Sequence, residues 1–128
     1  MNRRDALSRV ALLVGGSVIG AEAFLSGCKT ATKYGESLNF TPEDIAYLNE
    51  VAETILPATD TPGAKEAKVG EFMTVIVKDC YEEKDQKTFL EGMKKLDEAS
   101  TKKNGKSFME STPQQRHDLL VDLDKEAK

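Results

Sequence analysis

The sequence predicts an all-α protein, a small bundle of about four helices. Two of the threonine-proline pairs, Thr41-Pro42 and Thr112-Pro113, stand directly before apolar-periodic segments, where they can cap a helix. Apolar residues follow each pair, and also occur in two segments between them, at three- and four-residue spacing. This is the spacing of helices that bury one face.

The first predicted helix covers about residues 41–56. Thr41 fits the cap and Pro42 the first helical position, and the two acidic residues that follow suit the positive end of a helix. Pro57 is expected to end it. An apolar stripe is expected to face the core, and it consists of Ile45, Leu48, Ala52, Ile55 and Leu56.

A turn-rich connection with a Pro62-Gly63 pair follows, and Ala64–Lys68 could form one helical turn inside it. A second helix is predicted at about residues 71–80, with Phe72, Val75 and Ile76 directed inward. The run "FMTVIV" is rich in β-branched residues, so a buried strand is the alternative here, and we favour the helix.

A third, longer helix is predicted at about residues 84–103, and Asn104-Gly105 supplies its end. Its expected inward residues are Phe89, Leu90, Met93, Leu96 and Ala99. The fourth helix starts after Thr112, where Gln115 completes a capping box. Its inward residues are Leu119, Leu120 and Leu123.

The N-terminal segment has a different composition. Three arginines, including the adjacent pair Arg3 and Arg4, precede the twelve apolar or small residues Val10–Ala21. This run is shorter than the about 20 residues that span a bilayer, and it fits the apolar region of an export signal. An amphipathic surface helix is the alternative, but the glycines in the run disfavour it. The Arg3-Arg4 pair resembles the twin-arginine signal, which exports folded proteins.

The segment Leu25-Ser26-Gly27-Cys28 resembles the lipobox of bacterial lipoproteins, in which cleavage precedes a lipid-modified cysteine. More than one acyl chain on Cys28 would give a stable membrane anchor. We therefore expect a signal at residues 1–27, a polar tether at residues 28–40 and a helical domain at residues 41–128. The expected location is the cell envelope, on its periplasmic side, with the inner and outer membranes both open.

Charge restricts the choice of partner. Residues 28–128 hold 15 basic and 20 acidic residues, a net charge of −5, which disfavours binding to nucleic acid and electrostatic docking on anionic lipid. They include seven aromatic residues and no tryptophan, so a mainly aliphatic core is expected. With Cys28 lipidated, Cys80 has no partner in the chain; we expect it to be buried rather than reactive or bonded to another chain.

The residues give no indication of a catalytic, metal or cofactor site in this chain. The single histidine, His117, occupies an exposed-looking helical position, and the Glu82-Glu83 pair suits the polar first turn of a helix. Asp60 lies in the connection between helices, where a carboxylate can accept backbone N–H bonds and fix a turn. Contact with a partner chain is the other interpretation of Asp60, and the two are compatible.

The stretch Leu48–Gly70 resembles the opening of the gluconate 2-dehydrogenase subunit 3 family, through an I-L-P helix end, the T-D-T-P-G-A stretch at residues 59–64 and the aromatic Phe72. The resemblance continues through F-L-x-G at Phe89 and through G-x-x-F and T-P-x-Q-R from Gly105 to Arg116. It implies a small accessory subunit without a cofactor of its own. It further implies a flavoprotein dehydrogenase partner with FAD, acting on gluconate or a sugar, and in some cases a cytochrome subunit with haem c.

In this family the small subunit typically carries the twin-arginine signal and escorts the folded flavoprotein, which lacks one. The residues we expect to contact the partner are Asp60, Pro62, Gly63 and Phe72. Family members usually continue with a further helix, so the domain is expected to be short at its C-terminus. A stand-alone envelope lipoprotein that binds another partner through a helical surface is the alternative function. An autonomous enzyme is the least favoured.

Overall fold

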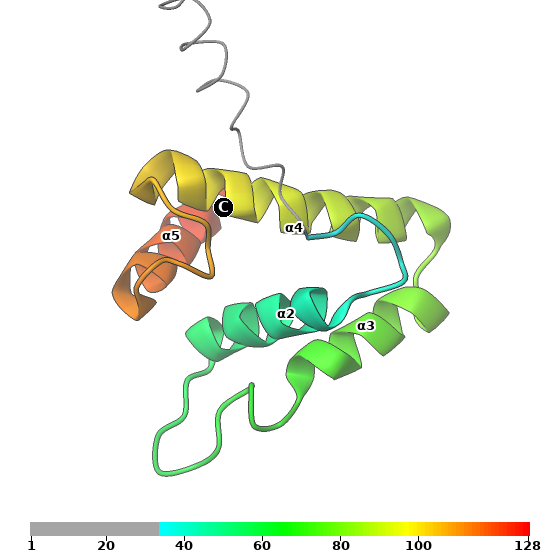
Figure 1. The fold of residues 1–128 in the computed structure, drawn as a ribbon, viewed down its shortest axis with the longest axis horizontal. Coiled ribbons are helices and arrows are strands. Elements are labelled where there is room, and N and C mark those ends of the chain that lie inside the picture. Colours follow the sequence, from blue (N-terminus) through cyan, green and yellow to red (C-terminus); the bar gives the residue numbers. More distant parts are fainter. Residues whose placement is uncertain (1–33) are drawn as a thin grey trace, which may run out of the picture. The chain divides into compact units, whose positions relative to one another are not determined.

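The computed structural model describes residues 34–128, and these residues form four helices and no strand (Figure 1). The helices are α2 (Pro42–Ile55), α3 (Val69–Cys80), α4 (Glu83–Asn104) and α5 (Pro113–Glu126). The predicted all-α fold class is confirmed, and the alternative of a buried strand at residues 72–77 is wrong. Arg3, Arg4 and Cys28, with the rest of the predicted export signal, lie outside the described residues.

Helix ends lie where the local sequence predicts them. At α2 the Thr41 hydroxyl accepts a hydrogen bond from the Asp44 amide, and the Asp44 carboxylate accepts one from the Thr41 amide at 2.9 Å. Thr112 and Gln115 exchange the same pair of bonds at the start of α5. These reciprocal bonds satisfy backbone donors that the first turn of a helix leaves free.

Aromatic rings fill the centre of the core. Tyr47 of α2 and Phe108 of the α4–α5 connection are fully buried, with ring centroids 5.6 Å apart in an edge-to-face arrangement. Tyr34 stacks on the other side of Tyr47, with centroids 4.2 Å apart and planes within 8°. Burial raises the pKa of Tyr47, whose hydroxyl donates to the Met93 carbonyl at 3.1 Å. The expectation of a mainly aliphatic core is therefore wrong at its centre, where Leu48, Met93 and Leu119 surround the rings.

Residues 34–40, which we placed in a polar tether, pack onto the helices. Beside Tyr34, the Gly35 amide donates to the Asp44 carboxylate at 3.1 Å, and Phe40 makes an edge contact with Phe89. Gly35 has φ +71°, and a Cβ there would lie 2.5 Å from the Leu90 carbonyl oxygen, so only glycine fits. Two aromatic side chains give this otherwise polar segment enough apolar surface to bury.

The α4–α5 connection is held from both helices. The Arg116 guanidinium, 13% exposed, donates to the carbonyls of Phe108 at 2.8 Å and Met109 at 2.6 Å, and pairs with Glu50 of α2 at 2.8 Å. The Asp97 carboxylate of α4 accepts from the Phe108 amide at 2.8 Å. These charge-assisted bonds satisfy the backbone groups of Phe108, which is buried, and of Met109, and they fix the position of the Phe108 ring.

Helices α2 and α3 approach closely at Gly70. The Asn49 side chain accepts from the Gly70 amide at 2.8 Å and donates to the Glu71 carboxylate at 3.0 Å. A Cβ at residue 70 would lie 2.8 Å from both the Asn49 side chain and the Ile45 carbonyl oxygen, so a larger residue would force the helices apart. This contact directs Gly70, and Val77 two turns later, toward the interior.

The two helical glycines give a matched test of this contact. We expect Gly70→Ala to lower the free energy of unfolding by about 1–3 kcal/mol, because the added methyl group overpacks the α2–α3 contact. Gly92→Ala should instead raise it by about 0.5–1 kcal/mol, because no atom lies within 4 Å of its Cβ position and alanine favours the helix. Urea denaturation followed by circular dichroism measures both. Equal changes in the two variants would contradict the close contact.

Candidate partner-binding surface

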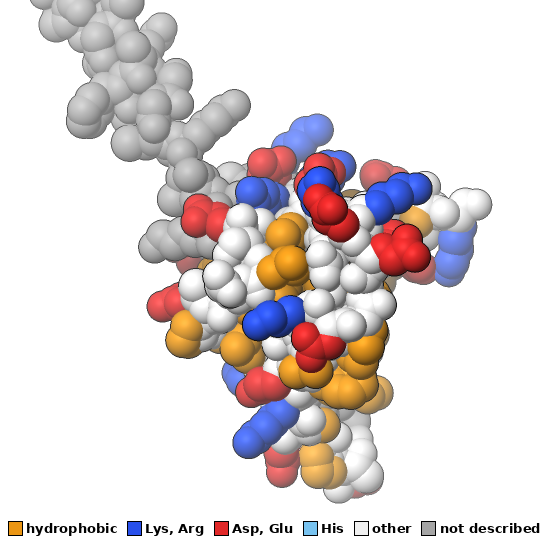
Figure 2. Space-filling model, turned by 90° about the vertical axis from the view of Figure 1, so that its right-hand side faces the viewer, with side chains coloured by type: hydrophobic (Ala, Val, Ile, Leu, Met, Phe, Trp, Pro, Cys, Tyr) orange, Lys and Arg blue, Asp and Glu red, His pale blue; other side chains and the backbone are white. Residues whose placement is uncertain are grey.

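Four large apolar side chains are exposed on α3 and at the end of α2. Their exposed fractions are 68% for Ile55, 64% for Leu56, 65% for Phe72 and 54% for Val75. We call these four residues the apolar surface. Figure 2 shows hydrophobic side chains exposed among charged ones on one side of the molecule, most of them in its lower half. Exposed apolar side chains in a group are typical of protein-binding surfaces.

The helical spacing predicted that these four residues face the core, and this prediction was wrong. The apolar residues of α3 form a broad stripe, wider than the part that packs inward, so spacing alone cannot decide which of them are buried. The close approach at Gly70 makes that choice, since it directs Gly70 and Val77 inward and leaves Phe72 and Val75 outside. Ile55 and Leu56 lie at the C-terminal end of α2, next to the exposed residues that follow it.

The connection between α2 and α3 is held in one conformation by Glu53. Its carboxylate accepts hydrogen bonds from the amides of Ala58 at 2.9 Å and Lys65 at 2.8 Å. A Cβ at Gly63 would lie 2.5 Å from this carboxylate, so glycine is needed where the connection passes it. The Ala64 amide also donates to the Leu56 carbonyl at 3.1 Å, which closes the loop onto the end of α2.

Glu50 ties the same connection to the core. Its carboxylate pairs with Lys65 of the connection and with Arg116 of α5. One side chain of α2 therefore links the loop to the buried guanidinium that holds Phe108. The predicted helical turn at residues 64–68 forms as overlapping turns and not as a helix, with bonds from Ala67 to Gly63 and from Val69 to Ala64.

The structure separates the residues that we expected to contact a partner. Asp60, Pro62 and Phe72 are exposed, whereas Gly63 is buried against Glu53. The interpretation that Asp60 fixes the turn is wrong, because Asp60 makes no hydrogen bond within residues 34–128 and Glu53 supplies the acceptor. Glu53 was missed because it looks like any polar helical residue, and its two donors lie five and twelve residues further along.

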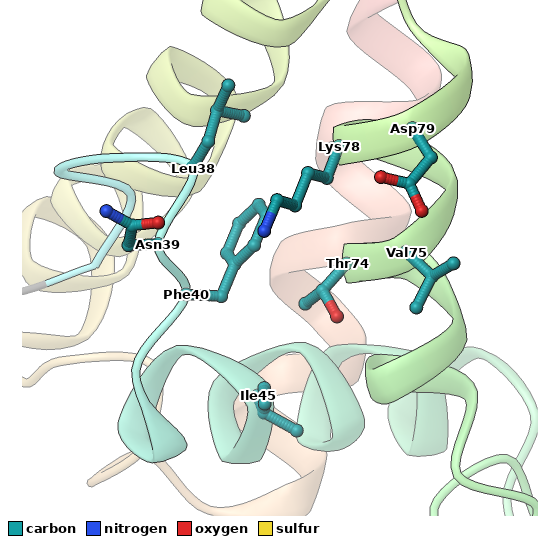
Figure 3. Close-up of a pocket in the computed structure, with 8 residues that line it drawn as sticks. All are labelled: Leu38, Asn39, Phe40, Ile45, Thr74, Val75, Lys78 and Asp79. Carbon is teal, nitrogen blue, oxygen red and sulfur yellow. The ribbon is translucent and has the colours of Figure 1, made fainter.

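A hollow of about 450 Å³ adjoins the apolar surface (Figure 3). It lies between residues 38–40, the first half of α2 and the second half of α3. Phe40, Ile45 and Val75 give it apolar walls, and Lys78 and Asp79 bring opposite charges to its α3 side. In Figure 3 the Lys78 side chain extends toward Phe40 and the Asp79 carboxylate lies on the side of Val75.

Other sequence-predicted residues lie on the surface. Cys80 is exposed, so its expected burial is wrong; it follows Val77, the last buried residue of α3. His117 is exposed, as expected. Within the described part of the chain, no group of three His, Cys, Asp or Glu side chains could hold a metal ion. No helix there has the length and apolar character needed to cross a membrane.

A family model described as gluconate 2-dehydrogenase subunit 3 matches residues 42–128, from the start of α2 onward. This chain belongs to the gluconate 2-dehydrogenase subunit 3 family. A search of curated proteins and a search of solved structures found no match.

The family motifs of this subunit 3 chain have two different structural roles. In the second half, Phe108 and Arg116 pack and bond to each other at the core, and the Asp97 carboxylate accepts from the Phe108 amide. Of the other motif residues there, Gly105, Thr112 and Pro113 are exposed. The stretch at residues 59–64 instead lies in the connection after α2, where only Gly63 and Ala64 are buried. A surface segment that is held rigidly by Glu53 is suited to contact another protein.

Hydrogen bonds from Lys65 and Ala58 lower the pKa of Glu53. Order in the connection should therefore be complete above about pH 4.5, the usual value of the group, and should be lost as the pH falls through the lowered pKa. Amide hydrogen exchange measures this as protection of Ala58 and Lys65. Glu53→Ala should remove the protection at neutral pH. Glu66→Ala, at an exposed residue of the same connection, should not. Unchanged protection in Glu53→Ala would show that other contacts hold the loop.

Proposed function

We propose that this chain is an accessory subunit that binds a flavin-dependent gluconate or sugar dehydrogenase and leaves the chemistry to that partner. FAD, and haem c where a cytochrome subunit is present, belong to the partner subunits. The observation that carries the proposal is the apolar surface of Ile55, Leu56, Phe72 and Val75, beside a loop fixed by Glu53. Membership in the subunit 3 family supports it.

Two physical arguments support a protein partner on this surface. Covering apolar area gains about 25 cal/mol for each Å² removed from water, so four such side chains favour association. The Glu53 hydrogen bonds already order the connection, so binding a partner does not cost the conformational entropy of ordering it. Aromatic residues near the centre of an interface often dominate its energy, and Phe72 is the aromatic residue of this set.

The N-terminal sequence supports the second part of the proposal, which is export and anchoring. We infer that Arg3 and Arg4 direct the chain, with its folded partner attached, to the twin-arginine pathway. Cys28 then carries the lipid that anchors the complex to a membrane on the periplasmic side. A route for folded proteins suits a subunit whose partner must load FAD before it crosses the membrane.

The docking proposal predicts the effect of one charge on the apolar surface. Phe72→Asp should reduce the amount of flavoprotein in the envelope fraction by about tenfold or more. The new carboxylate would lie in a contact that is otherwise apolar, and the contact of the Phe72 ring would be lost. Thr88→Asp, which adds the same charge at an exposed residue of α4, should have no effect. The measurements are flavin fluorescence and dehydrogenase activity in fractionated cells, with the thermal unfolding of both variants as a check on folding.

Deletion of the whole chain gives the decisive comparison for this function. The flavoprotein should then stay in the cytoplasm with its FAD bound. Normal dehydrogenase activity in the envelope of the deletion strain would disprove the escort role and favour the stand-alone lipoprotein.

The anchoring proposal predicts two separable phenotypes. Replacing Arg3 and Arg4 together by lysine should stop export, so that this chain and the flavoprotein both remain in the cytoplasm. Cys28→Ser should leave export intact but release the complex from membranes, because the acyl chains are missing. Immunoblots of cytoplasmic, periplasmic and membrane fractions distinguish the two results. Membrane retention of Cys28→Ser would show that something other than lipid holds the chain.

A further inference from the structure

The negative charge of the described chain is concentrated in its first half. Residues 34–82, which include α2, the connection and α3, hold ten acidic and three basic residues, a net charge of −7. Residues 83–128, which include α4 and α5, hold ten of each, a net charge of zero. The half that carries the apolar surface and the hollow therefore carries all of the net charge.

The two halves also differ in how their charges are paired. Of the seven ion pairs among the described residues, five lie within residues 83–128, and the other two share Glu50. The exposed carboxylates of Asp60, Asp79 and Glu82 have no ion-pair partner within residues 34–128. Carboxylates that are already exposed and unpaired can meet a basic partner at little desolvation cost.

Asp79 connects this charge to the hollow. It lines the hollow together with the apolar residues Phe40, Ile45 and Val75, and Val75 belongs also to the apolar surface. The site therefore offers walls for an apolar side chain with a carboxylate at the edge (Figure 3). Lys78 lies at the same edge and carries the opposite charge, so the lining has no net charge and the negative charge around the hollow comes from the other acidic residues of residues 34–82.

We propose that the hollow binds an apolar side chain of a partner segment that also carries lysine or arginine, and that the basic residue pairs with Asp79. This inference rests on the proposed function and specifies the chemistry of the surface that the dehydrogenase subunit presents. A second copy of this chain bound through the same half does not fit, because two halves of net charge −7 would face each other. An anionic bilayer does not fit for the same reason.

Two synthetic peptides test the chemistry directly. Both contain two central leucines, flanked by arginines in one peptide and by glutamates in the other. We add each to the full-length, isotope-labelled chain in an uncharged detergent and follow the backbone amide signals. The arginine peptide should shift signals of residues 38–40 and 74–79, with affinity that falls between about 0.01 M and 1 M salt as screening increases. The glutamate peptide should bind weakly or not at all.

Three variants show whether each charged side chain raises or lowers the affinity for the arginine peptide. Asp79→Asn should lower the affinity for the arginine peptide by up to about fivefold, which is the range that the loss of an exposed ion pair produces. Lys78→Gln should raise the affinity for the arginine peptide, because the positive charge of Lys78 no longer repels the arginines. Glu98→Gln, at an exposed and unpaired carboxylate of α4, should change nothing. Equal binding of the two peptides, shifts outside the hollow, or no binding to any form would each overturn the inference.

Cell fractionation separates this inference from the proposed function. Asp79→Lys should reduce export of the flavoprotein in cells. If export fails in the deletion strain but is normal with Asp79→Lys, the docking chemistry proposed for the hollow is wrong and the escort role stands. If export is normal in the deletion strain, the escort role is wrong whatever the peptides bind.

Discussion

The surface of this protein depends on the contact between Asn49 and the first turn of α3. The Asn49 amide bonds to both the Gly70 backbone and the Glu71 carboxylate, at 2.8 Å and 3.0 Å, and the absence of a Cβ at Gly70 lets the helices approach. Two bonds from one buried side chain fix the rotation of α3 as well as its distance from α2. Because the apolar stripe of α3 is wider than its contact with the core, that rotation decides which apolar residues are buried and which are exposed.

A second set of contacts makes the rest of the fold a stable support for this surface. Glu50 pairs with Arg116, and Arg116 in turn donates to two adjacent carbonyls within the α4–α5 connection and covers the Phe108 ring. Glu50 also reaches Lys65 in the connection after α2. A change in the core near Phe108 and a change in the surface loop are thus linked through one carboxylate, and mutations at these residues should not be additive.

The division of charge gives the two halves of the domain different roles. Residues 83–128, which include α4 and α5, carry equal numbers of acidic and basic residues and contain five of the seven ion pairs among the described residues, and they supply many of the inward apolar side chains around Tyr47. The α2–α3 half keeps unpaired carboxylates and exposed apolar side chains together. In the proposed docking, electrostatic attraction would raise the rate of encounter with a basic partner, while apolar burial and the ordered loop would supply the affinity.

Local sequence determined the helices of this protein, because their ends depend on neighbours three or four residues apart. The capping boxes at Thr41 and Thr112 and the glycine at the end of α4 formed as predicted, and so did the inward faces of α4 and α5. The motifs at residues 59–64 and from Phe89 to Arg116 were enough to indicate the family. Only tertiary structure decided that Phe72 faces outward, that Glu53 and not Asp60 holds the loop, and that Tyr34 belongs to the core. Each depends on groups brought together from separate elements, and periodicity along one helix carries no information about those groups.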